Sequence, residues 1–131
     1  MISLEDFCPT VLSLMGFQQE IPATVQTRDL SEQIRGNREK MPSSQLYMFY
    51  GAVNETGKNL TTGARGVRTL QYTYAIRYKD GVITEEHLYD RKTDPFQLNN
   101  IAGKHPELVK QLRTELKQRM EAVHDPALSV L

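Results

Sequence analysis

The stretch that decides the fold is Leu70-Gln71-Tyr72-Thr73-Tyr74-Ala75-Ile76-Arg77-Tyr78, followed by Lys79-Asp80-Gly81. Large apolar side chains alternate with polar or small ones, which is the period of a β-strand with one buried face. Asp80 and Gly81 both accept positive φ angles, as a two-residue type I′ turn requires. We therefore expect residues 82–89 to return as an antiparallel strand.

The residues before this hairpin divide into a strand and a loop. Residues 45–53 are rich in aromatic and apolar side chains, which predicts a strand buried on both faces. Residues 54–64 contain Gly57 and Gly63 among polar residues, which is typical of a loop. With the hairpin, these segments predict an antiparallel sheet of three to four strands.

A long helix is expected at the C-terminal end, over residues 106–123. Pro106 suits a first helical position, where its missing N–H would have no partner. An apolar stripe with a four-residue spacing runs through Leu108, Leu112, Leu116 and Met120. We expect this stripe to pack on the strand face formed by Leu70, Tyr72, Tyr74 and Ile76.

The N-terminal segment also has helical features. Residues 5–15 should form a helix that ends at Gly16, with the apolar residues Phe7, Val11, Leu12, Leu14 and Met15 on one side. Cys8 is expected to be a buried thiol on this helix, and residues 17–28 to form an extended loop. Asp29 is placed to cap a short helix over residues 30–34.

These elements predict an α+β fold in which a small antiparallel sheet packs against a long C-terminal helix. The 131 residues suffice for one domain, with residues 1–42 as a helix and loop segment and residues 43–131 as the sheet and helix. The formal net charge of +0 gives no electrostatic reason to expect nucleic acid or an anionic membrane as a partner. The acidic start, Met1-Ile2-Ser3-Leu4-Glu5-Asp6, lacks the basic region of a signal peptide, and the compartment stays undecided.

Three segments resemble the C-terminal region of formylglycine-dependent sulfatases, and they occur in the family's order. The first, residues 88–102, resembles that family's LYD-x-x-x-DP-x-E-x-x-NLA segment. Residues 65–74 resemble its RxVRTxxYKY strand, and residues 3–12 with Gly16 its S-x-x-D-x-x-PT-x-L start. The resemblance implies the same α+β subdomain and relates the chain to sulfuric ester hydrolases, most of all those acting on sulfated glycans.

The family's catalytic nucleophile is made from a Cys or Ser in the motif C/S-x-P-x-R, and this chain lacks the motif. The residues two places before its six prolines are Phe7, Glu20, Lys40, Thr93, Lys104 and His124. Cys8 directly precedes Pro9, and Leu12 stands where the arginine would be. We therefore expect no catalytic residue in this chain and no sulfatase activity from it alone.

The resemblance also implies calcium or magnesium in an intact sulfatase, bound by an Asp-Asp pair and a later Asp-Asn or Asp-His pair. The six aspartates here are followed by Phe7, Leu30, Gly81, Arg91, Pro95 and Pro126, so neither pair occurs. His87, His105 and His124 lack the spacing of zinc ligands. We expect no metal or other cofactor in this chain.

Cationic residues near the predicted loop are the candidates for substrate binding. Lys58, Arg65 and Arg68 lie in or beside it, and an arginine fork suits a sulfate or carboxylate. The alternative is a solvated loop with cations at the start of a strand. Asp90, Asp94 and Asn99 also match the family, and for these a structural role in a turn is expected.

Two functions of different classes stay open. In the first, the chain is the C-terminal portion of a sulfatase, whose missing catalytic domain is its partner. In the second, it is a non-catalytic interaction domain that binds another copy of itself. Either way, apolar surface left without a partner should favour self-association.

Overall fold

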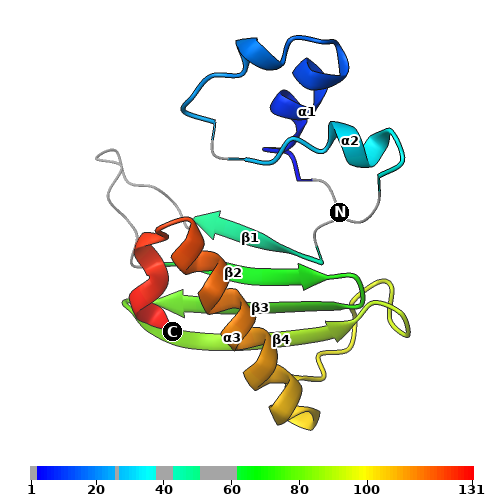
Figure 1. Ribbon diagram of the computed structural model, residues 1–131. Coiled ribbons are helices and arrows are strands. Elements are labelled where there is room, and N and C mark those ends of the chain that lie inside the picture. Colours follow the sequence, from blue (N-terminus) through cyan, green and yellow to red (C-terminus); the bar gives the residue numbers. More distant parts are fainter. Residues whose placement is uncertain (1–2, 26, 38–42, 51–61) are drawn as a thin grey trace. The chain divides into compact units, whose positions relative to one another are not determined.

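The computed structural model describes residues 3–25, 27–37, 43–50 and 62–131 (Figure 1). The chain forms two compact units, Met1–Ser43 and Ser44–Leu131, where one domain of two segments was expected. No helix within these described ranges is long and apolar enough to cross a membrane.

The C-terminal unit is a four-stranded antiparallel sheet with one long helix. Its strands are β1 (Ser44–Tyr50), β2 (Thr62–Thr69), β3 (Tyr72–Lys79) and β4 (Val82–Asp90), and they lie in sequence order across the sheet. Asp80 and Gly81 join β3 to β4 with φ angles of 52° and 77°, which confirms the predicted turn. The α+β class and the four strands agree with the prediction.

Helix α3 (Pro106–Ala122) lies across one face of this sheet (Figure 1). The core between them contains Tyr74, Ile76 and Tyr78 of β3 and Leu112, Leu116 and Met120 of α3. Leu108 packs against this cluster while partly exposed. The predicted packing of the helix stripe on the tyrosine strand is confirmed for these residues.

The start of the tyrosine strand was predicted wrongly. Leu70 is 75% exposed, and it lies in a turn that separates β2 from β3. The Thr69 hydroxyl accepts hydrogen bonds from the backbone N–H groups of Gln71 (3.2 Å) and Tyr72 (2.8 Å). These bonds satisfy the backbone of a tight turn, so residues 65–74 form parts of two strands instead of one.

Strand β2 was not predicted as a strand of its own, because the expected loop extended to residue 64 and residues 65–69 were expected to belong to the tyrosine strand. Residues 62–64 already belong to it, whereas residues 54–61 of the expected loop lie outside the described residues.

Strand β1 was expected to be buried on both faces, yet Tyr47 and Phe49 are 55% and 57% exposed. The reason is that both side chains lie on the face of the sheet opposite α3, which this helix does not cover.

The N-terminal unit contains α1 (Phe7–Leu14), the 3₁₀ turn Gln18–Glu20 and α2 (Ser31–Ile34). Both predicted helices are present, and Gly16 follows α1 with a φ of 84°. The apolar side of α1 faces outward: Phe7 and Met15 are 63% and 62% exposed, while Thr10 and Ser13 are buried. Cys8 is exposed and not buried.

Hydrogen bonds inside this unit explain why the polar side of α1 faces inward. Thr10 Oγ1 accepts a hydrogen bond from Leu30 N (3.0 Å), and the Ser13 hydroxyl donates to the Asp29 carboxylate. Asp6 accepts from Arg28 N (3.1 Å) and from the Arg28 guanidinium (2.9 Å). These contacts give the segment 28–31 its backbone partners, so the polar side of α1 faces inward.

Asp6 is ionised in this setting. Burial by itself would raise the pKa of its carboxyl group. Hydrogen bonds from Ser3 and Arg28 to the charged form outweigh that effect, and the pKa lies below its usual value. The aspartate of the N-terminal signature is therefore a structural anion that holds residue 28 in place.

Candidate functional site

The sheet face opposite α3 carries the side chains with the richest chemistry. The strand register sets them in three rows across β1 to β4: Gln45, Arg68, Thr73 and Tyr89; then Tyr47, Gly66, Ala75 and His87; then Phe49, Ala64, Arg77 and Glu85. We call this surface the open face. Small residues occupy its centre, between aromatic side chains of β1 and polar side chains of β4.

A shallow hollow of about 330 Å³ lies on the open face. It is lined by Tyr47, Phe49, Ala64, Ala75, Arg77, His87 and Tyr89. Gly66 cannot gain a side chain here, since a Cβ would lie 2.6 Å from the Tyr74 carbonyl oxygen. The small side chains at the centre thus leave room for the hollow, and the aromatic and charged side chains form its rim.

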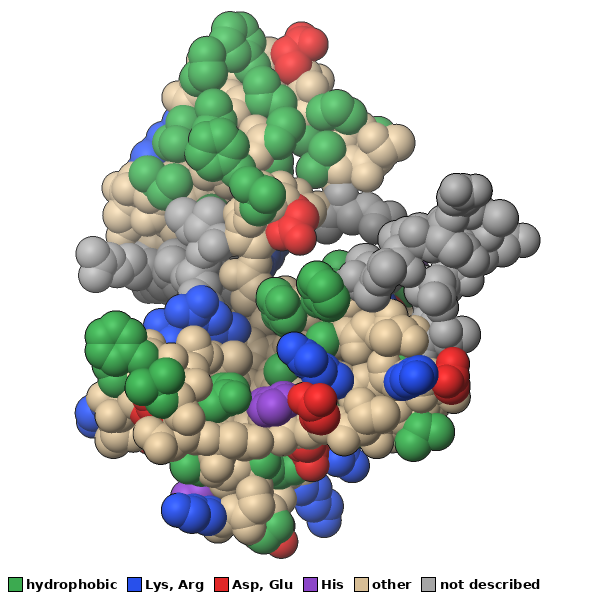
Figure 2. Space-filling view, turned by 180° about the vertical axis from the view of Figure 1, so that it is seen from behind, with side chains coloured by type: hydrophobic (Ala, Val, Ile, Leu, Met, Phe, Trp, Pro, Cys, Tyr) green, Lys and Arg blue, Asp and Glu red, His purple; other side chains and the backbone are tan. Residues whose placement is uncertain are grey.

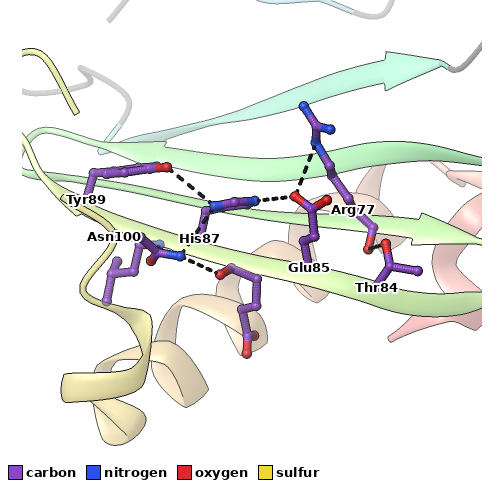
Figure 3. A network of polar contacts seen from close by, with 8 residues as sticks. Arg77, Thr84, Glu85, His87, Tyr89 and Asn100 are labelled. Atoms are coloured by element: carbon purple, nitrogen blue, oxygen red, sulfur yellow. Dashed lines mark hydrogen bonds and ion pairs between the residues drawn. The ribbon is translucent and has the colours of Figure 1, made fainter. Parts of the chain in front are cut away.

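The polar side chains of the rim form one connected network of contacts (Figure 3). His87 Nε2 lies 2.9 Å from Glu85 Oε2, and Arg77 Nε lies 3.8 Å from the same oxygen. The His87 ring stacks on Tyr89 with 6.1 Å between ring centroids and 8° between planes. Figure 2 shows acidic and basic side chains close together on this face.

The other side of β4 belongs to the core and not to a binding surface. Glu86 accepts hydrogen bonds from the Tyr74 hydroxyl and from Arg113 Nη2 (2.6 Å), which ties α3 to the sheet. Burial and the bond to Glu86 raise the pKa of Tyr74. Burial opposes ionisation of Glu86, but the bonds from Tyr74 and Arg113 lower its pKa overall. Glu85 and Glu86 therefore lie on opposite faces of the sheet.

Arg65 lies on the helix side of the sheet, fully buried. Its Nε donates to Asp125 Oδ2 (2.6 Å) and its Nη2 to Asp125 Oδ1 (3.1 Å), and both side chains have no exposed surface. The guanidinium also lies 5.6 Å from the centre of the Tyr78 ring. This bidentate pair joins β2 to the segment between α3 and the 3₁₀ turn Pro126–Val130.

Two of the three predicted substrate-binding residues are described by the structure, and these two lie on opposite faces of the sheet. Arg65 is in the core, and Arg68 is exposed in the first row of the open face. Lys58 lies outside the described residues. The structure thus does not bring Arg65 and Arg68 to one surface, and substrate binding by Lys58, Arg65 or Arg68 stays a prediction.

The signature loop after β4 is held by its polar residues. Asn100 Oδ1 accepts from Leu88 N and Ala102 N, each at 3.0 Å, and its Nδ2 donates to the Glu86 carbonyl (2.9 Å). The Asp94 carboxylate accepts from Asn99 N (2.8 Å). Asp90 accepts from Lys92 N (2.9 Å) and from the Gln71 side chain (3.0 Å). The structure therefore confirms the expected structural role of Asp90 and Asp94, which hold the turn by hydrogen bonds.

A divalent cation does not fit the residues that the structure describes. Among them, no three His, Cys, Asp or Glu side chains come together in a group able to hold a metal. Asp6, Glu86, Asp94 and Asp125 are instead engaged with backbone N–H groups or arginines. Calcium or magnesium therefore has no evident site in the described part of this chain.

Comparison with known proteins defines the family. The family model for the C-terminal region of N-sulphoglucosamine sulphohydrolase matches residues 1–125. The endo-4-O-sulfatase of Bacteroides thetaiotaomicron is 30% identical, over 96% of this chain and 27% of its own length. Arylsulfatase K of Bos taurus is 31% identical, over 88% of this chain and 21% of its own length. The chain belongs to the sulfatase family and corresponds to its C-terminal region.

Solved structures agree with this assignment. A Bacteroides fragilis protein assigned as a sulfatase, yidJ, superposes with a TM-score of 0.86 at 41% identity, over 99% of this chain and 27% of its own. A protein solved with its substrate D-glucosamine-2-N,6-O-disulfate has a TM-score of 0.73 at 26% identity, over 95% of this chain and 25% of its own. The chain thus spans about a quarter of the length of the relatives that it matches.

The open face itself was not foreseen from the sequence. Its centre comes from Ala64 and Gly66, which lie in the strand that the sequence did not reveal. The alternation of Arg77, Glu85, His87 and Tyr89 was present in the sequence as the outward positions of the hairpin. With β2 assigned, the same alternation would have placed them around a floor of small residues.

Proposed function

We propose that this chain serves as the C-terminal portion of a sulfatase that hydrolyses sulfate esters of glycans, and that it is inactive alone. The relatives that it matches are much longer, and roughly three quarters of each relative's length lies outside the matched region. In this proposal the nucleophile and the calcium or magnesium ion belong to a catalytic domain. This chain supplies the small sheet and its helix.

The outward apolar side of α1 is the observation that carries the proposal. We define the N-terminal apolar surface as Leu4, Phe7, Leu14, Met15 and Phe17, which are 39% to 89% exposed. In Figure 2 hydrophobic side chains gather over this unit. Since the polar side of α1 is already satisfied inside the unit, the apolar side is free to bind another protein surface. A catalytic domain is the partner that family membership provides.

The alternative is an interaction domain that has kept the sulfatase fold without the enzyme. In that case the N-terminal apolar surface binds a second copy of the chain. The coding sequence distinguishes the two functions. The first requires C/S-x-P-x-R and Asp-Asp motifs upstream in the same frame or in an adjacent gene, and the second requires neither.

An activity assay tests the inactivity of the chain. We expect the purified protein, supplied with calcium or magnesium, to hydrolyse 4-nitrophenyl sulfate no faster than a buffer blank. The Cys8→Ser variant should give the same result, because Cys8 lacks the proline and arginine of the nucleophile motif. Turnover above the blank by either protein would overturn the proposed inactivity.

A further inference from the structure

We propose that the open face binds an uncharged pyranose unit of a glycan, stacked over the hollow between Tyr47 and His87. This inference rests on the proposed function, since it concerns how a glycan-directed sulfatase would hold the chain of its substrate. It goes beyond that function because it assigns a site within the described residues of this chain.

The shape of the hollow suits a sugar ring. Its floor is made of Ala64 and Ala75, beside Gly66 in the strand register, and its volume of about 330 Å³ lies at the lower end of ligand sites. Tyr47 and Phe49 rise on the β1 side with more than half of their surface exposed. An exposed aromatic ring is flat and loses little conformational freedom on binding, so it can contact the C–H face of a pyranose.

The polar side of the hollow suits hydroxyl groups. Glu85 accepts, Arg77 donates, and the His87 ring can do either according to its tautomer. His87 is oriented by its contact with Glu85 and by its stacking on Tyr89, while the exposed Arg77 and Glu85 side chains can adjust to a ligand. A hydroxylated ring placed here would find both donors and acceptors within reach.

The charge of the hollow argues for an uncharged ring. The Glu85 carboxylate lies 3.8 Å from Arg77 Nε and offsets the positive charge of this guanidinium in the hollow itself. Arg68 is different: it is exposed and lies in the neighbouring row, across from Thr73 and Tyr89. We infer that an uncharged unit occupies the hollow and that a sulfate on an adjacent unit contacts Arg68.

Titration of the whole chain with two glycans tests this site. The probes are an N-acetylglucosamine tetramer and the same tetramer carrying 6-O-sulfates, followed by NMR at the amides of Gly66 and Ala75. Both should shift these amides, and the sulfated form should bind more tightly. Arg68→Gln should reduce the affinity for the sulfated form to that for the uncharged form.

Two variants distinguish binding in the hollow from unspecific binding to exposed aromatic side chains. Tyr47→Ala should weaken binding of both probes by about two- to tenfold, the loss of one aromatic contact. Phe96→Ala is the matched control, since Phe96 is 81% exposed in the loop after β4 and outside the hollow. Its affinities should be unchanged.

Three outcomes would overturn the site: no shift at Gly66 and Ala75 with either probe, equal loss in Tyr47→Ala and Phe96→Ala, or binding of the sulfated form alone. The last would show an anion site at Arg68 and not a pyranose site. None of these results bears on the activity assay. Failure of this inference is therefore distinguishable from failure of the proposed function.

Discussion

At the scale of single residues, signature positions act mainly as hydrogen-bond partners of the backbone. Asp6 and Thr10 hold residues 28 and 30, and Asn100 holds the two ends of the loop after β4. These groups satisfy N–H groups that would otherwise be left without a partner. Among the described residues, the motifs shared with sulfatases thus specify the shape of loops and the join between segments.

Removing Asp125 tests the most deeply buried contact. Asp125→Ala leaves the Arg65 guanidinium in the core without its carboxylate, and we expect a loss of about 3–5 kcal/mol in the free energy of unfolding. Urea denaturation measures it. Glu85→Ala is the control: its exposed contact with Arg77 should cost no more than about 1 kcal/mol. A similar small loss for both variants would contradict a structural role for the Arg65–Asp125 pair.

At the scale of elements, α3 and β3 contribute most of the core. The stripe on α3 meets Tyr74, Ile76 and Tyr78, and Glu86 with Arg113 fixes the helix across the sheet. Strand β1 contributes less, because it is an edge strand with exposed aromatic side chains. The stability of the C-terminal unit should therefore depend far more on α3 than on β1.

A truncation in α3 checks this packing. Leu112 is 5% exposed, so Leu112→Ala should lower the free energy of unfolding by about 2–5 kcal/mol through lost burial and a cavity. Leu70→Ala makes the same chemical change at a 75% exposed turn and should alter stability by less than about 0.5 kcal/mol. If Leu112→Ala behaved like Leu70→Ala, the assignment of the helix stripe to the core would be wrong.

At the scale of the whole molecule, the N-terminal apolar surface should determine the association state. Exposed apolar patches favour association, and a symmetric dimer is the commonest closed form. We therefore expect the isolated chain to self-associate with rising concentration. Light scattering across a concentration series measures this, and a strictly monomeric chain at high concentration would contradict it.

Surface variants identify the face responsible for association. Replacing Phe7 and Met15 together by Ser should shift the chain toward the monomer, because both are more than 60% exposed on the N-terminal apolar surface. Leu98→Ser removes a 78% exposed leucine from the C-terminal unit and should leave association unchanged. An equal effect of both variants would mean that association is not specific to the N-terminal surface.

The sequence by itself determined the hairpin, the helices and the family. Asp80-Gly81 requires one turn geometry, and the four-residue stripe requires one buried helix side, so local chemistry suffices for both. The absence of C/S-x-P-x-R and of Asp-Asp is likewise visible without a structure. These features are local, and each is read from residues that are neighbours along the chain.

Only the tertiary structure decided which sides are inside. The apolar side of α1 faces outward because Asp6, Thr10 and Ser13 find their partners in residues 28–31, a segment some twenty positions away. Arg65 is buried because the fold brings it to Asp125, which lies 60 positions further along the chain. The open face exists because β2 places Ala64 and Gly66 between β1 and β3. Periodicity reports how apolar a side is, but burial is set by the partners that the fold brings to it.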